Sequence, residues 1–527
     1  MEAIENVQPA SHVSPWLIAF TVMLATFMEV LDTSVANVSL PHIAGNLSAS
    51  VDESTWILTS YLVSNAIVLP LTGWFSTLFG RKRFYIACVV VFTISSFLCG
   101  LAPTLPLLVI FRVIQGIGGG GLQPISQAVL VDSFPREKQG MAMAMYGMGV
   151  VVAPTIGPTL GGWITDSYSW RWIFLLNVPI GIVSVLMTSV LIVDPPYMIR
   201  KTLKEGLKID FIGLGLLCVG LGFLQIVLDK GQRDDWFSSP FILWLTVIAV
   251  SSLIGLVIWE LSTDHPVIDL RLLKDRNFLV ATVLIYVVGV VFYGTTVLLP
   301  ILLQTLMGYT ATQSGMVLFP GGLAVLILMP LVGWMLNRSE SRWLVMFGFA
   351  IAALGLTQLA HFDLDVSQRT PVYDWIVSRA GMAFLWVPIN VMAFYFVPKE
   401  KTNNATGLIN LARNIGGSMG ISLVTTMLDR RAQFHQNRLV GHLLPGNPIY
   451  QAALHHLTNL FTARGLNGAH ATIEAQSLLY HQLQRQSMML SFVDNFRLMA
   501  ILCLGVIPLM FTMKKMKPRN KATVPAH

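Results

Sequence analysis

Charged residues are scarce in this chain of 527 residues, because only 12% of them are Asp, Glu, Lys or Arg. A soluble globular chain has roughly 25% charged residues, so this low content excludes a protein whose surface is mainly exposed to water. Hydrophobic residues make up 54% of the chain, and its mean hydropathy is +0.66. Such a surface is stable in lipid, where apolar runs of about 20 residues cross the hydrocarbon core as helices. The composition therefore predicts an all-α, polytopic membrane protein.

Cysteine is also rare, and the four cysteines share neither the spacing of a metal site nor that of a disulfide framework. Each lies in an apolar stretch, which favours a buried thiol. They are Cys88, Cys99, Cys218 and Cys503. No phosphate-binding loop of the type G-x-x-x-x-G-K-[ST] occurs in the sequence, which argues against ATP as the energy source. We therefore expect no cofactor.

The N-terminal segment lacks the features of a cleavable signal peptide. Residues 1–15 contain Glu2 and Glu5, no Lys or Arg, and no small-residue cleavage pattern. A signal peptide needs a basic region and such a cleavage site. The first apolar run, which starts near Trp16, is therefore expected to act as its own insertion signal and to stay in the membrane.

Long apolar runs predict fourteen transmembrane helices, numbered here as spans 1 to 14 in chain order. The eight in the first half lie at about 16–39, 55–79, 83–102, 105–131, 139–163, 172–193, 210–228 and 240–261. The remaining six lie at about 278–303, 312–336, 343–361, 372–397, 404–427 and 495–513.

Lys and Arg in the connections give these spans an orientation, because cytoplasmic loops carry an excess of basic residues. A cytoplasmic N-terminus places most of the basic clusters on the cytoplasmic side, and the short outer loops then hold few. Those clusters are Arg81 to Arg83, Arg136 and Lys138, Arg200 to Lys208, Arg271 to Arg276, Arg338 and Arg342, Lys399 and Lys401, and Lys514 to Lys521. Both termini are therefore predicted to be cytoplasmic. The net charge of +7 is then a topology signal, and nucleic acid is not an expected partner.

The connection between spans 13 and 14, residues 428–494, is long and predicted to lie outside. Long loops cross the membrane largely regardless of their charge, so its arginines do not conflict with this orientation. Apolar residues recur in it at the spacing of amphipathic helices. They include Leu454, Leu457 and Phe461, and Leu479 and Leu483.

The two halves of the chain contain matching segments. Pro70–Trp74 (PLTGW) recurs as Pro330–Trp334 (PLVGW), and Pro135–Lys138 (PREK) recurs as Pro398–Lys401 (PKEK). The offsets of 260 and 263 residues are nearly constant, and each copy falls at an equivalent place relative to the spans. Internal repeats of this kind flank a substrate site near the membrane midplane, which opens alternately to the two sides.

The repeat predicts a division of the chain into three parts. Residues 1–195 form an N-terminal six-helix bundle, 196–265 two inserted linker helices, and 266–527 a C-terminal six-helix bundle that includes the outer loop 428–494.

Two carboxylates lie inside the first apolar run. Glu29 and Asp32 are three residues apart and therefore lie on nearly the same helical face. A charged residue at the bilayer centre costs about 2.5–3.5 kcal/mol, so each needs a partner or a watery cavity. Protonation removes that cost, which makes such a carboxylate a natural proton carrier. The alternative is that the pair only makes polar contacts between helices.

An arginine and a glycine-rich segment mark span 4. Arg112 is permanently charged, so in the membrane it needs an acceptor, for which a carboxylate of span 1 is the obvious candidate. Gln115, Gly116 and the glycines that follow allow another helix or a substrate to approach closely. The alternative for Arg112 is that it snorkels to the outer interface. For Arg379, its counterpart in span 12, snorkelling is the preferred interpretation.

Span 5 contains two prolines and three glycines in the segment Pro154–Gly162. Gly157 and Gly161 form a small-x-x-x-small contact face, while the prolines loosen the helix. The segment predicts a kinked, tightly packed helix. The motif residues are Pro154, Gly157, Pro158, Gly161 and Gly162.

The connection between spans 2 and 3 combines glycines with a basic cluster and is a candidate gating loop. Its residues Gly73, Gly80, Arg81 and Lys82 are the ones of interest. Anchoring at the cytoplasmic surface explains the charges adequately, and any gating role is secondary.

The outer loop offers no plausible catalytic or metal site. Its histidines match no standard ligand pattern beyond one adjacent pair, which favours solvated surface. The carboxylates of the loop are few, namely Asp429, Glu474 and Asp494. A polytopic membrane enzyme needs a cluster of catalytic acids, bases or nucleophiles, so the sequence argues against an enzyme.

At this point the sequence resembles the major facilitator superfamily and, within it, the fourteen-helix drug:proton antiporters of the EmrB/QacA type. The resemblance covers nearly the whole chain and is most specific in spans 1 and 5. The segments that carry it are Leu31–Pro41, Arg112–Gly116, Pro154–Gly162 and Trp170–Gly181.

The resemblance implies a function and roles for individual residues. It implies that Asp32 couples transport to protons, that Arg112 assists proton transfer, and that structurally varied hydrophobic or cationic compounds are exported. The long outer loop looks like that of the Gram-negative branch, which works in the inner membrane with a periplasmic adaptor and an outer-membrane channel. In that branch the loop is a candidate for adaptor docking.

The sequence departs from the family pattern at two positions. Thr77 stands where the superfamily usually has an Asp in the loop after span 2, so an interdomain charge contact made by that Asp cannot form. Glu29 is not part of the signature, and it adds a second titratable site or biases the pocket towards cations. A dedicated exporter of one metabolite, such as a fatty acid, siderophore or antibiotic precursor, remains the alternative function.

Overall fold

A computed structural model describes residues 14–135, 138–194, 210–263, 266–336, 338–364, 370–395, 397–398 and 401–514. All regular secondary structure in these ranges is helical, as the composition predicted. Some predicted features lie outside the described residues. They are the basic residues Arg136, Arg200 to Lys208, Lys399 and those after Lys514, and the boundaries at 195–196 and 265.

The helices of the first third of the chain lie close to the predicted spans. They are α1 (Pro15–Asn46), α2 (Val51–Ser54), α3 (Trp56–Phe79), α4 (Arg81–Leu101), α5 (Leu105–Gly119), α6 (Leu122–Ser133), α7 (Gln139–Ser167), α8 (Arg171–Leu175) and α9 (Asn177–Leu191). Two further long helices follow, joined by a short 3₁₀ turn. These are α10 (Phe211–Lys230), η2 (Trp236–Ser238) and α11 (Pro240–Ser262).

The rest of the chain adds six long helices and several short ones. They are η3 (Leu270–Lys274), α12 (Arg276–Thr305), α13 (Ala311–Met335), α14 (Ser341–Leu359), α15 (Thr370–Phe394), α16 (Thr402–Leu439), η5 (Val440–Leu443), α17 (Pro448–Ala463), α18 (Gly468–Gly505) and η6 (Ile507–Thr512).

Twelve helices of the described chain are long and apolar enough to cross a membrane. α7 is a thirteenth, bent by 43° between Gln139–Pro154 and Ile156–Ser167, which is the kink that its two prolines predicted. α16 completes the fourteen predicted spans, although it is not among these apolar helices. Its buried residues include several polar side chains, because one side of it faces the interior of the protein and not lipid.

The helices pack in two sets that meet along two seams. In the first set α1 packs on α7 and α9, and α4 on α5. In the second set α12 packs on α16, and α14 on α15. The seams are formed by α7 against α13 and by α3 against α16. α10 and α11 pack on each other, and α10 also contacts α3 and α16.

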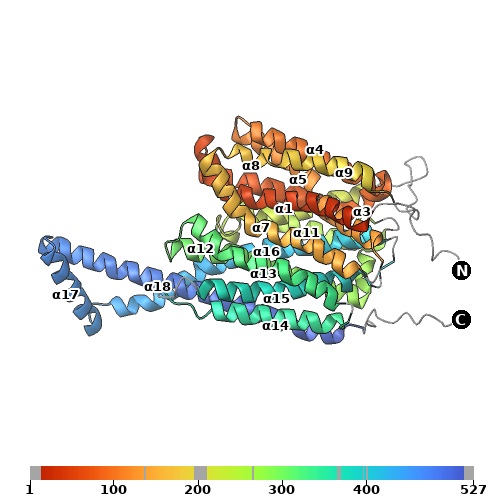
Figure 1. Ribbon diagram of the computed structural model, residues 1–527. Helices are drawn as coiled ribbons and strands as arrows, with labels where there is room; N and C mark the ends of the chain where they lie inside the picture. Colours follow the sequence, from red (N-terminus) through yellow and green to blue (C-terminus); the bar gives the residue numbers. More distant parts are fainter. Residues whose placement is uncertain are drawn as a thin grey trace.

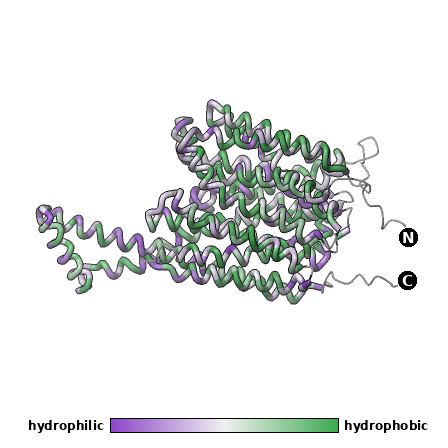
Figure 2. The backbone as a smooth tube through the Cα atoms, in the orientation of Figure 1, coloured by the Kyte–Doolittle hydropathy of each residue, from purple (hydrophilic) through white to green (hydrophobic). Residues whose placement is uncertain are grey.

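The segment predicted as an outer loop is a helical hairpin, in which the helix of the last predicted span begins before residue 495. α16 continues beyond the bundle to Leu439, and α18 runs without a break from Gly468 to Gly505. α17 closes the hairpin, and Asn447 and Asn467 cap α17 and α18 with their side chains. The hairpin projects from the end of the bundle opposite to the start of α1 and to η6 (Figure 1). Hydrophilic residues are more frequent along it than over the bundle (Figure 2).

Polar contacts hold the two arms of the hairpin together. Arg431 and His435 of α16 both contact Oδ2 of Asp494 on α18, at 2.6 and 2.8 Å. Gln436 donates to the Tyr480 hydroxyl at 2.8 Å. His435 therefore belongs to a polar cluster around Asp494. Its position in the predicted loop had suggested solvated surface instead.

Candidate functional site

Asp32 lies in the middle of α1 and is almost fully buried, with 2% of its surface exposed. Its Oδ2 atom accepts a hydrogen bond from Nη1 of Arg112 at 2.5 Å, so the two side chains form an ion pair. Its Oδ1 atom accepts from Nε2 of Gln115 at 3.0 Å and from Nδ2 of Asn177 at 2.7 Å. The carboxylate thus receives hydrogen bonds from α5 and α9, which compensate for its removal from water.

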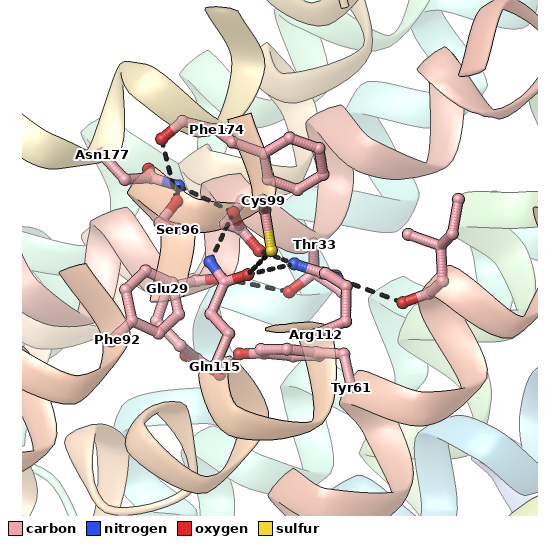
Figure 3. A network of polar contacts seen from close by, with 12 residues as sticks. Glu29, Thr33, Tyr61, Phe92, Ser96, Cys99, Arg112, Gln115, Phe174 and Asn177 are labelled. Carbon is pink, nitrogen blue, oxygen red and sulfur yellow. Dashed lines mark hydrogen bonds and ion pairs between the residues drawn. The ribbon is translucent and has the colours of Figure 1, made fainter. Parts of the chain in front are cut away.

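Arg112 of α5 is fully buried and does not snorkel to the outer interface. Its Nε donates to the backbone oxygen of Ile57 at 3.1 Å, and Nη1 also donates to Oε1 of Gln115 at 2.9 Å. The ring centroids of Tyr61 and Phe174 lie 4.4 and 5.5 Å from Cζ (Figure 3), within the range of cation–π attraction. Arg112 is therefore the counter-ion of Asp32 inside the N-terminal set of helices.

The glycines that follow Arg112 bring α5 close to its neighbours. A methyl group on Gly116 would overlap the Ser64 hydroxyl and the backbone oxygen of Tyr61 on α3. One on Gly118 would lie 2.6 Å from the backbone nitrogen of Phe92 on α4. This close approach is what small residues permit in helix pairs within membranes, and it holds Arg112 next to α1 and α3.

Glu29 is buried as well, with 5% of its surface exposed, but it contacts different partners. Its Oε1 atom accepts hydrogen bonds from the Tyr61 hydroxyl at 3.1 Å and from Nδ2 of Asn65 at 3.3 Å. Its Oε2 atom accepts from Nε2 of Gln123 at 2.5 Å. Three residues of helix separate the directions of Glu29 and Asp32 by about 60°, and this rotation turns Glu29 towards α6 and the seam with α16.

The contacts of Glu29 continue across that seam. Oε1 of Gln123 accepts a hydrogen bond from Arg413 of α16, whose Cζ lies 5.2 Å from the ring centroid of Trp386. Asn414 donates to Oδ1 of Asn65 at 3.3 Å. A buried polar layer therefore joins the two sets of helices, with a carboxylate on one side and a guanidinium on the other.

Tyr61 belongs to both polar clusters. Its ring lies against the guanidinium of Arg112, and its hydroxyl donates to Glu29. Tyr61 therefore connects the Asp32–Arg112 pair to the layer between the two sets of helices.

The motif of α7 packs on α1 through two of its three glycines. A methyl group on Gly157 would overlap the Ser34 side chain, and one on Gly161 would lie 2.8 Å from Cγ1 of Val35. Gly162 has no atom within 4 Å of that position. The Ser34 hydroxyl donates to the backbone oxygen of Pro154 at 3.3 Å, one of the groups that a kinked helix leaves free, and Pro158 is half-buried. The predicted contact face is thus formed by Gly157 and Gly161.

The candidate gating residues lie at the junction of α3 and α4. Gly73 lies within α3, where a methyl group would overlap the Asn404 side chain of α16. Gly80 breaks the helix with a φ of +82°, a conformation that favours glycine. Thr77 donates to the backbone oxygen of Gly73 at 3.0 Å and so stays within its own helix.

The basic residues after Gly80 are not simple surface anchors. Arg81 is 2% exposed and pairs with Asp132 at the end of α6. The backbone N–H of Lys82 donates to Oδ1 of Asp194 at 2.7 Å, and its Nζ donates to the backbone oxygen of Ser189 at 2.6 Å. The prediction of surface anchoring was therefore wrong for Arg81, because the carboxylate of Asp132 holds its side chain inside the protein.

Arg379 does not snorkel either, which corrects its predicted position. It is 4% exposed in α15, and its Cζ lies 3.8 Å from the ring centroid of Trp375 and 4.5 Å from that of Phe292. Its Nη2 donates to the hydroxyl oxygens of Thr296 at 2.7 Å and Thr295 at 3.3 Å. Hydrophobicity alone could not distinguish a guanidinium held by rings inside the bundle from one at its edge.

Sequence reasoning missed several partners of the two carboxylates. Arg413 lay inside span 13, where an arginine is by default a functional candidate, so a signal for it was present. Gln123 and Asn177 are neutral amides in apolar segments, and Tyr61 is an ordinary span residue. No group of three or more His, Cys, Asp or Glu residues suited to a metal ion occurs in the described ranges.

Comparison with known proteins places this architecture in a family. The model of the Major Facilitator Superfamily matches residues 22–421. The chain is 37% identical over 512 residues to the multidrug export protein EmrB of Escherichia coli strain K12, which covers 97% of this chain and 98% of that protein. It is 35% identical over 491 residues to the fatty acid resistance protein FarB of Neisseria gonorrhoeae, with coverage of 93% and 94%.

A solved structure supports the same fold. That of the proton:xylose symporter XylE aligns with a TM-score of 0.59 over 96% of this chain and 97% of the symporter, at 15% identity. The predicted major facilitator fold is confirmed. The chain belongs to the major facilitator superfamily and, within it, to the Gram-negative drug transporters of the EmrB type.

Proposed function

We propose that this multidrug efflux transporter exports hydrophobic or cationic compounds across the bacterial inner membrane in exchange for protons. Its likeness to EmrB over nearly the whole chain supports multidrug export. The observation that carries the proton coupling is the buried ion pair between Asp32 and Arg112, 2.5 Å apart and 2% and 0% exposed. A carboxylate buried inside a membrane-spanning helix is by default a functional residue, and a carboxylate can carry a proton.

Proton loading on Asp32 would remove the ion pair and leave Arg112 with neutral partners. These partners are the backbone oxygen of Ile57, the amide oxygen of Gln115 and two aromatic rings. Because they compensate the guanidinium less well than a carboxylate, Arg112 would shift, and Tyr61 would shift with it. Because Tyr61 donates to Glu29, this shift would reach the buried polar layer, which we propose to be the substrate site.

Alternating access would come from rocking of the two proposed bundles, residues 1–195 and 266–527. Reciprocal close contacts support this division. Gly73 of α3 abuts Asn404 of α16, and Gly333 of α13 abuts Met141 of α7, with the added methyl group 3.1 and 3.2 Å from the two Cα atoms. These pairs are related by the offsets of 260 and 263 residues found in the sequence. The inserted helices α10 and α11 belong to neither bundle in this proposal.

The projecting hairpin of α16, α17 and α18 supports an orientation with both termini in the cytoplasm. Its polar arms lie at the end of the bundle opposite to the start of α1 (Figures 1 and 2). A rigid helical projection outside the membrane is a docking surface for a periplasmic adaptor, which would connect to an outer-membrane channel.

Proton coupling is tested with the purified protein in proteoliposomes and an imposed pH gradient. We expect the gradient to drive accumulation of a cationic dye, and Asp32→Asn to abolish this accumulation. Asp166→Asn is the matched control, because Asp166 is 69% exposed at the end of α7. Unchanged transport by Asp32→Asn would remove Asp32 from the coupling mechanism.

Adaptor docking is tested by replacing α17, residues 448–463, with a short Gly-Ser linker. Because α17 lies at the tip of the hairpin (Figure 1), transport in proteoliposomes should persist while drug resistance of cells that also express the adaptor is lost. Full resistance of such cells would contradict the docking role.

A second candidate function is dedicated export of one carboxylate-bearing metabolite. The printed name of the relative FarB, a fatty acid resistance protein, favours it. A drug-susceptibility panel on a deletion strain, with and without complementation, separates the two. Hypersensitivity to many unrelated compounds supports multidrug export, and hypersensitivity to a single compound supports the dedicated exporter.

A further inference from the structure

The C-terminal set of helices contains a buried cation without a carboxylate partner. Arg379 forms no ion pair within the described residues, and its Nη1 atom is buried there without a hydrogen-bond partner. Its counterpart in the N-terminal set, Arg112, is neutralised by Asp32. A buried guanidinium is stable only with an acceptor of opposite charge or a polar cavity, so an acceptor is missing at Arg379.

The groups around Arg379 supply lone pairs but no negative charge. The hydroxyl hydrogens of Thr295 and Thr296 are donated to the backbone oxygens of Val291 and Phe292, both at 2.6 Å. Their oxygens therefore act as acceptors towards Arg379 and remain neutral. Two rings occupy the surroundings of the guanidinium, Trp375 at 3.8 Å and Phe292 at 4.5 Å. Nη1 is the guanidinium nitrogen that these groups leave unsatisfied.

The internal repeat shows how this arrangement differs from that of Arg112. With the offset of 260 residues that relates the two PLTGW-like segments, Gly321 of α13 corresponds to Tyr61 of α3. A methyl group on Gly321 would lie 2.5 Å from Cδ1 of Trp375 and 3.1 Å from Cγ of Arg379. Glycine at position 321 thus leaves room for the ring of Trp375 and for Arg379. At the corresponding position the N-terminal set has Tyr61, which donates to Glu29.

Arg379 lies near the layer between the two sets of helices, with two aromatic rings in between. Phe292 lies against Arg379 on one side and 6.5 Å from the ring of Trp386 on the other. Trp386 in turn lies next to Arg413. A ligand held at Arg379 would therefore lie two rings from Arg413 of the buried polar layer.

We propose that Arg379, with Thr295 and Thr296, forms an anion-binding site in the C-terminal set of helices. It binds the carboxylate of a hydrophobic substrate or a free inorganic anion such as chloride. The inference rests on the proposed export function for its role in transport, but the binding step needs no transport. In transport the site would bind hydrophobic carboxylates, whereas Glu29 would favour cations.

The test measures binding to the full-length, detergent-purified protein by calorimetry. The probes are 2-naphthoate, the neutral analogue 2-naphthol, and chloride. We expect 2-naphthoate to bind the wild type at least about tenfold more tightly than 2-naphthol, as a charge-assisted hydrogen bond requires. Arg379→Gln should abolish this preference, and Arg379→Lys should retain part of it.

A second variant keeps the proposal testable if Arg379→Gln does not fold. Thr296→Asp places a carboxylate within reach of Arg379, as Asp32 is placed for Arg112. It should raise the thermal midpoint in anion-free buffer and abolish 2-naphthoate binding. Arg338→Gln is the matched control, because Arg338 also stacks on a tryptophan, Trp334, at 4.0 Å but is exposed. It should leave binding unchanged.

The outcomes distinguish a substrate carboxylate from a free anion, and they distinguish failure of the anion site from failure of the export function. Binding of 2-naphthoate that depends on Arg379 supports a substrate carboxylate, whereas Arg379-dependent binding of chloride alone supports a free anion. Equal affinity of wild type, Arg379→Gln and Thr296→Asp for both anions would overturn the site. If the export function is wrong, proteoliposomes of the wild type accumulate neither dye nor naphthoate, while the binding results stand.

Discussion

Removal of the charge on Asp32 offers a direct measure of how strongly the buried ion pair stabilises the fold. Asp32→Asn keeps the size of the side chain and an oxygen that can accept from Gln115 and Asn177, but it leaves Arg112 without a counter-ion. The carboxylate and the guanidinium are 2% and 0% exposed, so water cannot replace the lost partner. Loss of one member of such a pair costs about 3–5 kcal/mol.

The reverse change gives a similar cost. Arg112→Gln leaves Asp32 with two amide donors and also removes the attraction to the Tyr61 ring, which contributes about 2 kcal/mol when desolvated. The double variant, Asp32→Asn with Arg112→Gln, contains only neutral amides that can hydrogen-bond to one another. Its loss should therefore be smaller than the sum of the single losses by about 3 kcal/mol.

The assay is unfolding of the detergent-purified protein in an SDS titration followed by tryptophan fluorescence, for all four members of the cycle. Additive losses, or single losses below about 1 kcal/mol, would refute the assignment, because values of that size are typical of exposed ion pairs. Transport of a cationic dye by the double variant should stay abolished, since restored stability does not restore a proton-binding carboxylate.

Two further predictions concern the contact face of α7 and the charge at the seam. Gly161→Ala should lower the free energy of unfolding by about 1–3 kcal/mol, because its methyl group presses on α1. Gly162→Ala should be neutral or stabilising by up to about 1 kcal/mol, because no atom lies within 4 Å of the added methyl group. Equal losses in the same titration would contradict the assigned face. Glu29→Gln should reduce proteoliposome uptake of a cationic dye by about tenfold, a loss of about 1.4 kcal/mol of favourable interaction, and leave a neutral substrate within about twofold. An equal loss for both substrates would show a structural role and not an electrostatic one.

Much of the fold was predictable because lipid imposes simple rules on sequence. Backbone groups must be satisfied within each span, so apolar runs of the required length became α1, α3 and the other long helices. The sequence also predicted the span of α16 at 404–427, although buried polar residues such as Asn410 and Arg413 make this helix less apolar than the others. Hydropathy did not show that α18 begins at Gly468, because a helix outside an apolar environment keeps its backbone hydrogen bonds without needing apolar residues.

Sequence alone also identified Glu29, Asp32 and Arg112 as the unusual charges, because the cost of burying them is visible in any apolar run. Only the tertiary structure decided their partners. Helical spacing puts Glu29 and Asp32 on nearly one face, yet the two side chains meet different helices. Asp32 pairs with Arg112 of α5, whereas Glu29 contacts Gln123 of α6, which in turn contacts Arg413 of α16. For Arg379 the neighbouring helices supplied rings and hydroxyls in place of a carboxylate. Periodicity determines the direction of a side chain from its own helix, whereas the group that it meets depends on how separate helices pack.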